Sequence, residues 1–507
     1  MTERWQELNR QAIDSLQRGD LERAESFLQQ GLKAARTDHG EDHESVAVTL
    51  NNMGELYLQA GDYEQSEQAL LQSIAVSEKA HGTGALEVGE TMLNLAELYS
   101  LQQRHQEADH QIDGLVAIFE ARPADDQALL VSVYNSCATL YLEAGRMEQA
   151  KSHLENARQV LDRRGQEEPE LGVILKSLAV IDRYQGEFDG AEKKLRRALS
   201  IFEHSLGPEH PELAGALAHL AEVYLNQGLL QAAEPLLTQA LDIYRHAHSE
   251  PQPEAGAAID RLAALYAATG RTEKAEPLYR EVLDIYQSTL GDEHPALAEV
   301  QNSLAEMYIN GGRYEEGFGL IESALAIREK SFGTAHPAVA QSLNNMAVVY
   351  DRRGDQALAL RQHKKALEIR EKVFGEDHPA VTQSLDNMAA IYRAQGKTAD
   401  AAALLEKSLA IWQNARGGDH PAAAQSYHNL ATLYIEAEKY EQAEEALLSS
   451  RKILEKDRDS NQMHLATVFE TLSGLYKRMG KERESNEYAA RSLKIRKPEQ
   501  MGNSPAH

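Results

Sequence analysis

Side-chain amides recur at a fixed interval in the second half of the sequence. Gln341, Gln383 and Gln425 are 42 residues apart, and an asparagine follows each of them four positions later. The amides singled out as a binding set are Asn302, Gln341, Asn344, Asn345, Gln383, Asn387, Gln425 and Asn429. An amide offers both a donor and an acceptor, so a row of amides can pair with the backbone of an extended peptide. The same pattern also suits a solvated inner face or bonds between neighbouring helices.

Histidines that precede proline are the second group with possible chemistry. They are His210, His294, His336, His378 and His420. Ligands of one zinc ion each lie ~2 Å from the metal, whereas equivalent positions on stacked helices are about 10 Å apart. Proline favours the first position of a helix, where its missing N–H leaves no bond unmade. These histidines are therefore predicted to cap helices, and no metal site is expected.

The remaining reactive side chains do not form a catalytic set. Cys137 lies in an apolar helical pattern, which favours a buried thiol over a nucleophile. His246 and His248 form a lone pair without a third ligand. No phosphate-binding loop, nucleophile elbow, zinc-protease or dinucleotide motif occurs in the sequence. We expect no catalytic residue, no cofactor and no enzyme activity.

The charge of the chain limits its partners. The 52 Lys and Arg residues and 79 Asp and Glu residues give a net charge of −27. Such a chain repels phosphate backbones and anionic lipid headgroups, which argues against nucleic acid and membrane partners. The sequence contains no signal-peptide pattern and no apolar run of ~18 residues. Together with the single cysteine, this predicts a cytoplasmic protein, and a monomer is favoured.

The side chains described above lie in units that repeat every 42 residues. Turn glycines lie at Gly19, Gly61, Gly145, Gly186, Gly228, Gly270, Gly312, Gly354, Gly396 and Gly480. Gln103 and Glu438 occupy the two missing turn positions, where looser or altered turns are expected. The fifth repeat is one residue short and has Asp182 in place of a tyrosine. The sequence thus contains about twelve repeats.

Each repeat is predicted to form two helices joined by a turn. A small residue, such as Ala347, lies seven positions before the turn, and another, such as Ala359, lies five positions after it. Small residues let two helix axes approach to ~8 Å. Tyr350 represents a tyrosine found four positions before the turn in ten repeats, and its hydroxyl is expected to reach water or a turn backbone.

These features resemble the tetratricopeptide repeat, in its kinesin-light-chain type. The matching segments include SLNNMAVVYDRRG (342–354), SLDNMAAIYRAQG (384–396) and AHLAEVYLNQG (218–228). The resemblance implies an all-α fold, a right-handed α-solenoid superhelix of about twelve repeats. It implies a continuous solenoid over residues 1–498, followed by a C-terminal tail at 499–507. The fifth repeat departs from the pattern, which predicts a kink or flexible joint near 164–172.

The resemblance also implies where a partner binds. Relatives line a concave face with the first helix of each repeat, and asparagines there contact extended peptides. This role carries over to Asn302, Asn344, Asn345, Asn387 and Asn429. We therefore expect a non-catalytic adaptor that binds a peptide segment or helix of another protein on its concave face. The alternative is a self-associating scaffold or a regulatory subunit of a larger complex.

Overall fold

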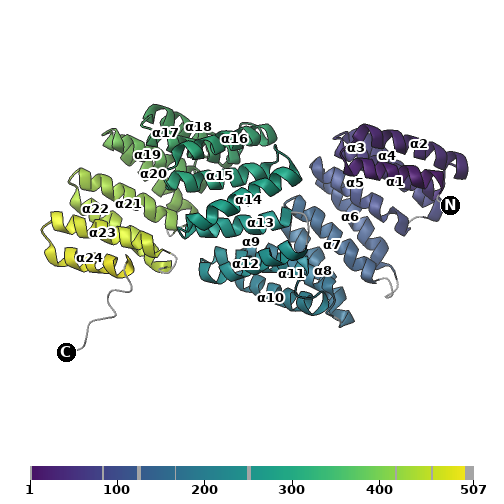
Figure 1. Cartoon of the computed structure of the whole chain (residues 1–507), viewed down its shortest axis with the longest axis horizontal. Coiled ribbons are helices and arrows are strands. Elements are labelled where there is room, and N and C mark those ends of the chain that lie inside the picture. The colour runs from purple at the N-terminus through teal and green to yellow at the C-terminus, as the bar shows by residue number, and fades with distance from the viewer. Residues whose placement is uncertain are drawn as a thin grey trace. The chain divides into compact units, whose positions relative to one another are not determined.

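The computed structural model of the chain is built from helices. It describes residues 3–82, 85–122, 127–165, 167–247, 253–416, 420–457 and 461–496. Within these ranges there are 24 α-helices and three 3₁₀ turns, η1 (Leu86–Val88), η3 (Pro379–Val381) and η4 (Glu455–Asp457), and there is no strand (Figure 1). The prediction of an all-α repeat fold is confirmed.

The chain divides into two compact units, Met1–Ala247 and His248–His507, here called unit 1 and unit 2. The helices of unit 1 are α1 (Arg4–Gln17), α2 (Leu21–His39), α3 (Glu44–Gln59), α4 (Tyr63–His81), α5 (Gly89–Leu101), α6 (His105–Glu120), α7 (Gln127–Glu143), α8 (Met147–Arg164), α9 (Pro169–Tyr184), α10 (Phe188–Ser205), α11 (Pro211–Asn226) and α12 (Leu230–Ala247). Those of unit 2 are α13 (Pro253–Ala268), α14 (Thr272–Leu290), α15 (Pro295–Asn310), α16 (Tyr314–Phe332), α17 (Pro337–Arg352), α18 (Gln356–Phe374), α19 (Thr382–Ala394), α20 (Thr398–Arg416), α21 (Pro421–Glu436), α22 (Tyr440–Leu454), α23 (Gln462–Arg478) and α24 (Glu482–Arg496).

Each odd-numbered helix packs chiefly on the even-numbered helix that follows it, so each unit consists of six consecutive helical hairpins. Hairpins of one unit then pack on their neighbours in sequence order. The predicted joint at 164–172 lies inside unit 1, and the predicted tail at 499–507 lies outside the described residues. A single continuous solenoid over 1–498 and a flexible joint both stay predictions.

The turn within a hairpin has one repeated geometry. At Gly354 the backbone φ is 87°, its N–H donates to the Asp351 carbonyl (2.9 Å), and the N–H of Asp355 donates to the Tyr350 carbonyl (2.9 Å). These two bonds form a Schellman motif, which requires a left-handed residue. Gln103 and Glu438 adopt the same conformation, with φ of 60° and 58°. The expectation of looser turns at these two residues is wrong, because the two hydrogen bonds hold even a β-carbon-bearing residue in place.

Glu438→Gly is therefore expected to stabilise the chain. A left-handed residue other than glycine costs about 1–2 kcal/mol, and the greater freedom of glycine in the unfolded chain offsets part of the gain. We expect a net increase of about 0.5–1 kcal/mol in the free energy of unfolding, measured by urea denaturation. The control is Glu445→Gly, at an exposed position inside α22, which should lose about 1 kcal/mol. Loss of stability in both variants would contradict the argument.

Small residues lie where the two helices of a hairpin cross, as predicted. Ala347 and Ala359 are both fully buried. At Gly54 a β-carbon would lie only 2.4 Å from the Leu70 side chain, so a larger residue would force the helices apart. The close crossing gives all the hairpins a common register. Residues at equivalent positions in successive repeats therefore occupy equivalent places on their helices.

The histidines of the His-Pro pairs cap helices, which confirms the prediction. In each case the ring Nδ1 accepts a hydrogen bond from the backbone N–H two residues later; the capping residues are His210, His294, His336, His378 and His420. Three of these rings also stack on an aromatic side chain at the end of the preceding hairpin, as His378 does on Phe374 (4.9 Å between centroids). These contacts fix the start of the helices that line the site described below.

Tyrosine hydroxyls connect neighbouring hairpins. Each donates to a carboxylate 32 residues earlier, in the pairs Tyr57–Glu25, Tyr99–Glu67, Tyr141–Asp109, Tyr224–Glu192, Tyr308–Glu276 and Tyr476–Glu444. The expectation of water or a turn backbone as the partner is wrong for these six. At Tyr308 the Arg313 guanidinium lies over the ring, 4.0 Å from its centroid, and bonds Glu276. Hydrogen bonds from Arg313 lower the pKa of Glu276 to about 2.

Candidate functional site

Six of the eight predicted amides meet in one groove of unit 2. The groove has a volume of about 900 Å³ and is lined by residues that include Gln341, Asn345, Gln383, Asn387, Gln425 and Asn429. They lie on α17, α19 and α21, the first helices of three consecutive hairpins (Figure 1). The glutamines are exposed, and the asparagines one helical turn later are partly buried. The common register of the hairpins explains how residues 42 apart in sequence form two parallel rows.

Several of these amides have unused hydrogen-bonding groups. Gln341 and Asn387 make no side-chain hydrogen bond to any described residue. The amide nitrogen of Asn345 is buried and also has no partner in the described part of the chain. By contrast, Gln383 accepts from Arg370 (3.0 Å), and Gln425 donates to Asn429 (3.0 Å). The groove thus presents donors and acceptors that an incoming chain can satisfy.

The other two predicted amides do not line the groove. Asn344 is only 2% exposed, and its amide fits its neighbours when the nitrogen donates to His363 Nδ1 (2.8 Å) and the oxygen accepts from Arg370 Nη1 (2.7 Å). Burial, with the nearby Arg370 charge, lowers the pKa of His363 to about 4, so this ring is a neutral acceptor. Asn302 is also 2% exposed. These two residues can affect a ligand only through the residues they position.

The groove is also lined by residues outside the predicted binding set, three of which come from second helices. Arg370, Phe374 and Trp412 reach the groove from the second helices of their hairpins. Arg370 is 8% exposed, donates to the Ser384 hydroxyl (3.0 Å), and has its pKa lowered by burial. The signal for it lies in the period: the position 16 residues after the turn is Tyr286 or Trp412 in two nearby repeats, whereas it is arginine here and at Arg328 in the preceding repeat.

Asp386 contributes a carboxylate to the same groove. Its Oδ2 accepts from the Ser426 hydroxyl (2.6 Å), while its buried Oδ1 has no partner among the described residues. Burial raises the pKa of Asp386 to about 6, and bonds from Ser426 and Ser408 oppose the rise. Near neutral pH this part of the groove holds a carboxylate that is poorly solvated and can accept a hydrogen bond from a ligand.

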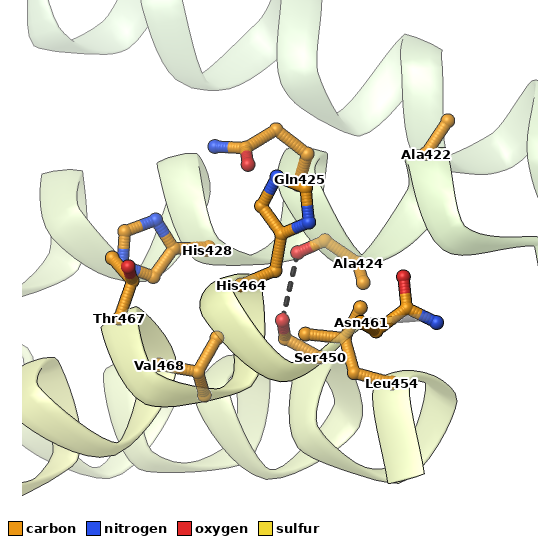
Figure 2. Close-up of a pocket in the computed structure, with 10 residues that line it drawn as sticks. All are labelled: Ala422, Ala424, Gln425, His428, Ser450, Leu454, Asn461, His464, Thr467 and Val468. Carbon is orange, nitrogen blue, oxygen red and sulfur yellow. Dashed lines mark hydrogen bonds between the residues drawn. The ribbon is translucent and has the colours of Figure 1, made fainter. Parts of the chain in front are cut away.

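A smaller hollow of about 290 Å³ adjoins the groove and shares Ala422 and Gln425 with it. Figure 2 shows its lining, which comes from α21, α22 and the start of α23, with the Ser450 hydroxyl donating to the Ala424 carbonyl. His428 Nε2 lies 2.9 Å from the Thr471 hydroxyl. Burial lowers the pKa of His428, and the charges of Arg393 and His464 act in the same direction. Shared lining residues make the hollow a continuation of the amide rows.

The other side chains considered from the sequence lie away from this groove. Cys137 is fully buried, and burial raises the pKa of its thiol to about 12. His246 is exposed and lies 2.6 Å from the Asp242 carbonyl, whereas His248 falls outside the described residues. In the described ranges, no group of three or more His, Cys, Asp or Glu residues could hold a metal ion. No helix there combines the length and apolar character needed to cross a bilayer.

Comparison with known proteins gives the following matches. The family model described as "Tetratricopeptide repeat" matches residues 8–79, 87–163, 170–246, 255–316, 297–372, 357–413 and 380–456. A solved structure from Podosopora anserina, described as a kinesin light chain with nearly identical TPR-like repeats, is 30% identical; the match covers 41% of this chain and 99% of that one, with a TM-score of 0.36. BtubC (BKLC) from P. vanneervenii is 23% identical over 55% of this chain and 94% of that one, with a TM-score of 0.35. No curated protein matches the sequence.

Proposed function

The chain belongs to the tetratricopeptide repeat family, and from this premise we propose that it is a non-catalytic adaptor whose groove in unit 2 binds an extended segment of a partner protein. Repeats of this family generally mediate protein–protein interaction, and proteins built from them are typically non-catalytic scaffolds. The net charge of −27 supports a protein partner over a nucleic acid.

The observation that carries the proposal is the pair of amide rows along the groove. An extended peptide exposes backbone N–H and C=O groups along both of its edges, and these groups need partners once water is removed. The unpartnered amides of Gln341, Asn345 and Asn387 can bind them on successive helices. Phe374 and Trp412 add apolar surface for a ligand side chain. Asn302 and Asn344, which are buried, are proposed to hold the residues that line the groove in position.

The test uses peptides selected on the full chain from a random library, with affinity measured by fluorescence anisotropy. The double variant Gln341→Ala/Asn387→Ala removes two free amides and breaks no side-chain hydrogen bond to a described residue. A net hydrogen bond contributes about 0.5–1.5 kcal/mol, so loss of two should weaken binding by about tenfold.

The matched control is Asn414→Ala/Gln442→Ala, which removes two exposed amides from the second helices α20 and α22. It should bind the selected peptides like the unmodified chain. Equal affinities for the groove variant and the unmodified chain would refute the groove assignment. Equal weakening in both variants would show that the peptides bind elsewhere.

A further inference from the structure

Unit 1 contains a smaller pocket, and its lining is acidic. It has a volume of about 230 Å³ and lies between α3, α4 and α5. Glu44, Glu87 and Glu90 line it together with Asn51, Ser77 and Thr91. Glu87 and Glu90 make no ion pair with any described residue, and Glu44 lies 3.7 Å from His81. The pocket therefore gathers carboxylates with little local compensation.

Ser77 is the second observation that points to a ligand. Its side chain lines the pocket, is only 3% exposed, and its hydroxyl has no hydrogen-bond partner in the described part of the chain. A buried hydroxyl without a partner costs about 1–3 kcal/mol. A ligand that donates a hydrogen bond in this pocket would remove that cost.

The repeat itself indicates which donor fits. Ser77 lies 16 residues after its turn, the position held by arginine in three hairpins of unit 2, at Arg328, Arg370 and Arg496. In two of these, Arg328 donates to the Ser342 hydroxyl (2.9 Å), and Arg370 donates to the Ser384 hydroxyl (3.0 Å). The chain thus already directs a guanidinium from this position to a serine hydroxyl in two of its hairpins.

The groups that receive these guanidiniums have equivalents in the unit 1 pocket. Thr91 is the equivalent of Ser384, and Glu90 is the equivalent of Gln383, which accepts from Arg370 (3.0 Å). In unit 1 the acceptors are present, one of them as a full carboxylate, while the residue at the arginine position is a serine. The pocket has the receiving groups of an arginine site without the arginine.

Further carboxylates on the helices around the pocket favour the binding of a cation. Glu55 and Glu97 lie on α3 and α5, the helices that carry Asn51 and Glu90. Burial and the charge of Glu90 raise the pKa of Glu55, and burial with the charges of Glu143 and Glu55 raises that of Glu97. Mutual repulsion of these carboxylates would be relieved by a bound positive charge.

We propose that this pocket binds the guanidinium of an arginine side chain carried by a partner protein. Glu87 and Glu90 supply acceptors for the planar fork of N–H donors, and Ser77 and Thr91 supply hydroxyls on the inner side. The site lies in unit 1 and takes a cation. It is therefore separate from the amide groove of unit 2 and does not depend on that groove's role.

The probe is a fluorescein-labelled acetyl-(Gly-Arg)₃-amide peptide, titrated with the full chain at 0.15 M salt. The comparison peptide carries citrulline, which keeps the shape of arginine and removes its charge. We expect the arginine peptide to bind at least tenfold more tightly than the citrulline peptide. Binding of both peptides with equal affinity, or of neither, would overturn the proposal.

Two variants locate the binding. Glu87→Gln/Glu90→Gln removes the acceptors' charge, and Ser77→Arg places a tethered guanidinium in the pocket, as the chain does at Arg328 and Arg370. Each should weaken the arginine peptide at least tenfold. The control Glu22→Gln/Glu64→Gln makes the same change in charge at exposed positions on α2 and α4, and should leave the affinity within twofold.

Equal weakening by the control would show attraction to the net charge alone and would overturn the site. An unchanged affinity in Glu87→Gln/Glu90→Gln would do the same, and this pair stays informative if Ser77→Arg fails to fold. The groove variant Gln341→Ala/Asn387→Ala should bind the arginine peptide normally. The two proposals can therefore fail independently.

Discussion

The double variant Lys151→Met/Lys194→Met is expected to lose about 3–5 kcal/mol of local stability in the α9–α10 hairpin. Asp182 is fully buried, and its two carboxylate oxygens lie 3.0 Å from Lys151 Nζ and 2.5 Å from Lys194 Nζ. Methionine is unbranched, keeps most of the length of each lysine and removes its charge. The variant therefore leaves a carboxylate in the core without a cation, which is among the most costly changes a core can undergo.

Amide hydrogen exchange of α9 and α10 is the appropriate measurement, because hairpins of a repeat array can open separately. The control adds Asp182→Leu to the two methionines. A triple replacement of this kind removes the buried charge altogether, so it should recover most of the loss. If the double variant exchanges like the unmodified chain, Asp182 is solvated by some other route and its two lysines are dispensable.

The second large effect is expected at Asp386, where asparagine should stabilise the chain at neutral pH. The folded-state pKa is about 6, above the ordinary value of 3.8. The folded chain then holds this proton more tightly than the unfolded chain does, so stability is highest below about pH 4 and falls as the pH rises through 6. At 1.36 kcal/mol per pKa unit, the ionised carboxylate costs at most about 3 kcal/mol at pH 7.5.

Asp386→Asn should therefore raise the free energy of unfolding by about 1–3 kcal/mol at pH 7.5. The repeat supports the choice, since Asn302 and Asn344 occupy the equivalent position. Urea denaturation at pH 7.5 and pH 4 checks the sign, because the advantage should vanish at the lower pH. A gain of the same size at both values would mean that charge is not its cause.

The hairpin architecture could be predicted from the sequence because its determinants are local. A turn glycine, a small residue at the crossing and a His-Pro cap each act within one repeat, and the structure has all three where the 42-residue period places them. The hydrogen-bond partners of the tyrosine hydroxyls were harder to predict. Tyr308 bonds Glu276 on the preceding hairpin, and the period alone does not show which polar side chains face one another between repeats.

The candidate site was only partly predictable, for a geometric reason. Asn344 and Asn345 are adjacent, and successive residues of an α-helix point about 100° apart. One therefore turns into the packed interior while the other lines the groove. An amide suits both places, so residue type cannot separate them. Arg370 was missed because the same repeat position is aromatic at Tyr286 and Trp412, and because arginine is seldom buried, although Arg328 holds this position in the preceding repeat.

The turns between hairpins allow such a chain to gain or lose whole repeats of 42 residues. Gly333 and Gly375 end α16 and α18 with nearly the same backbone, φ 76° and ψ 167° against φ 92° and ψ 157°. Each is followed by two residues and a His-Pro pair. Excision of residues 334–375 would join Gly333 to Glu376 and restore the same turn and the same cap. Duplication or deletion of one such repeat can thus add or remove one hairpin at a time. Each event of this kind would change by one the number of amide pairs available to a ligand.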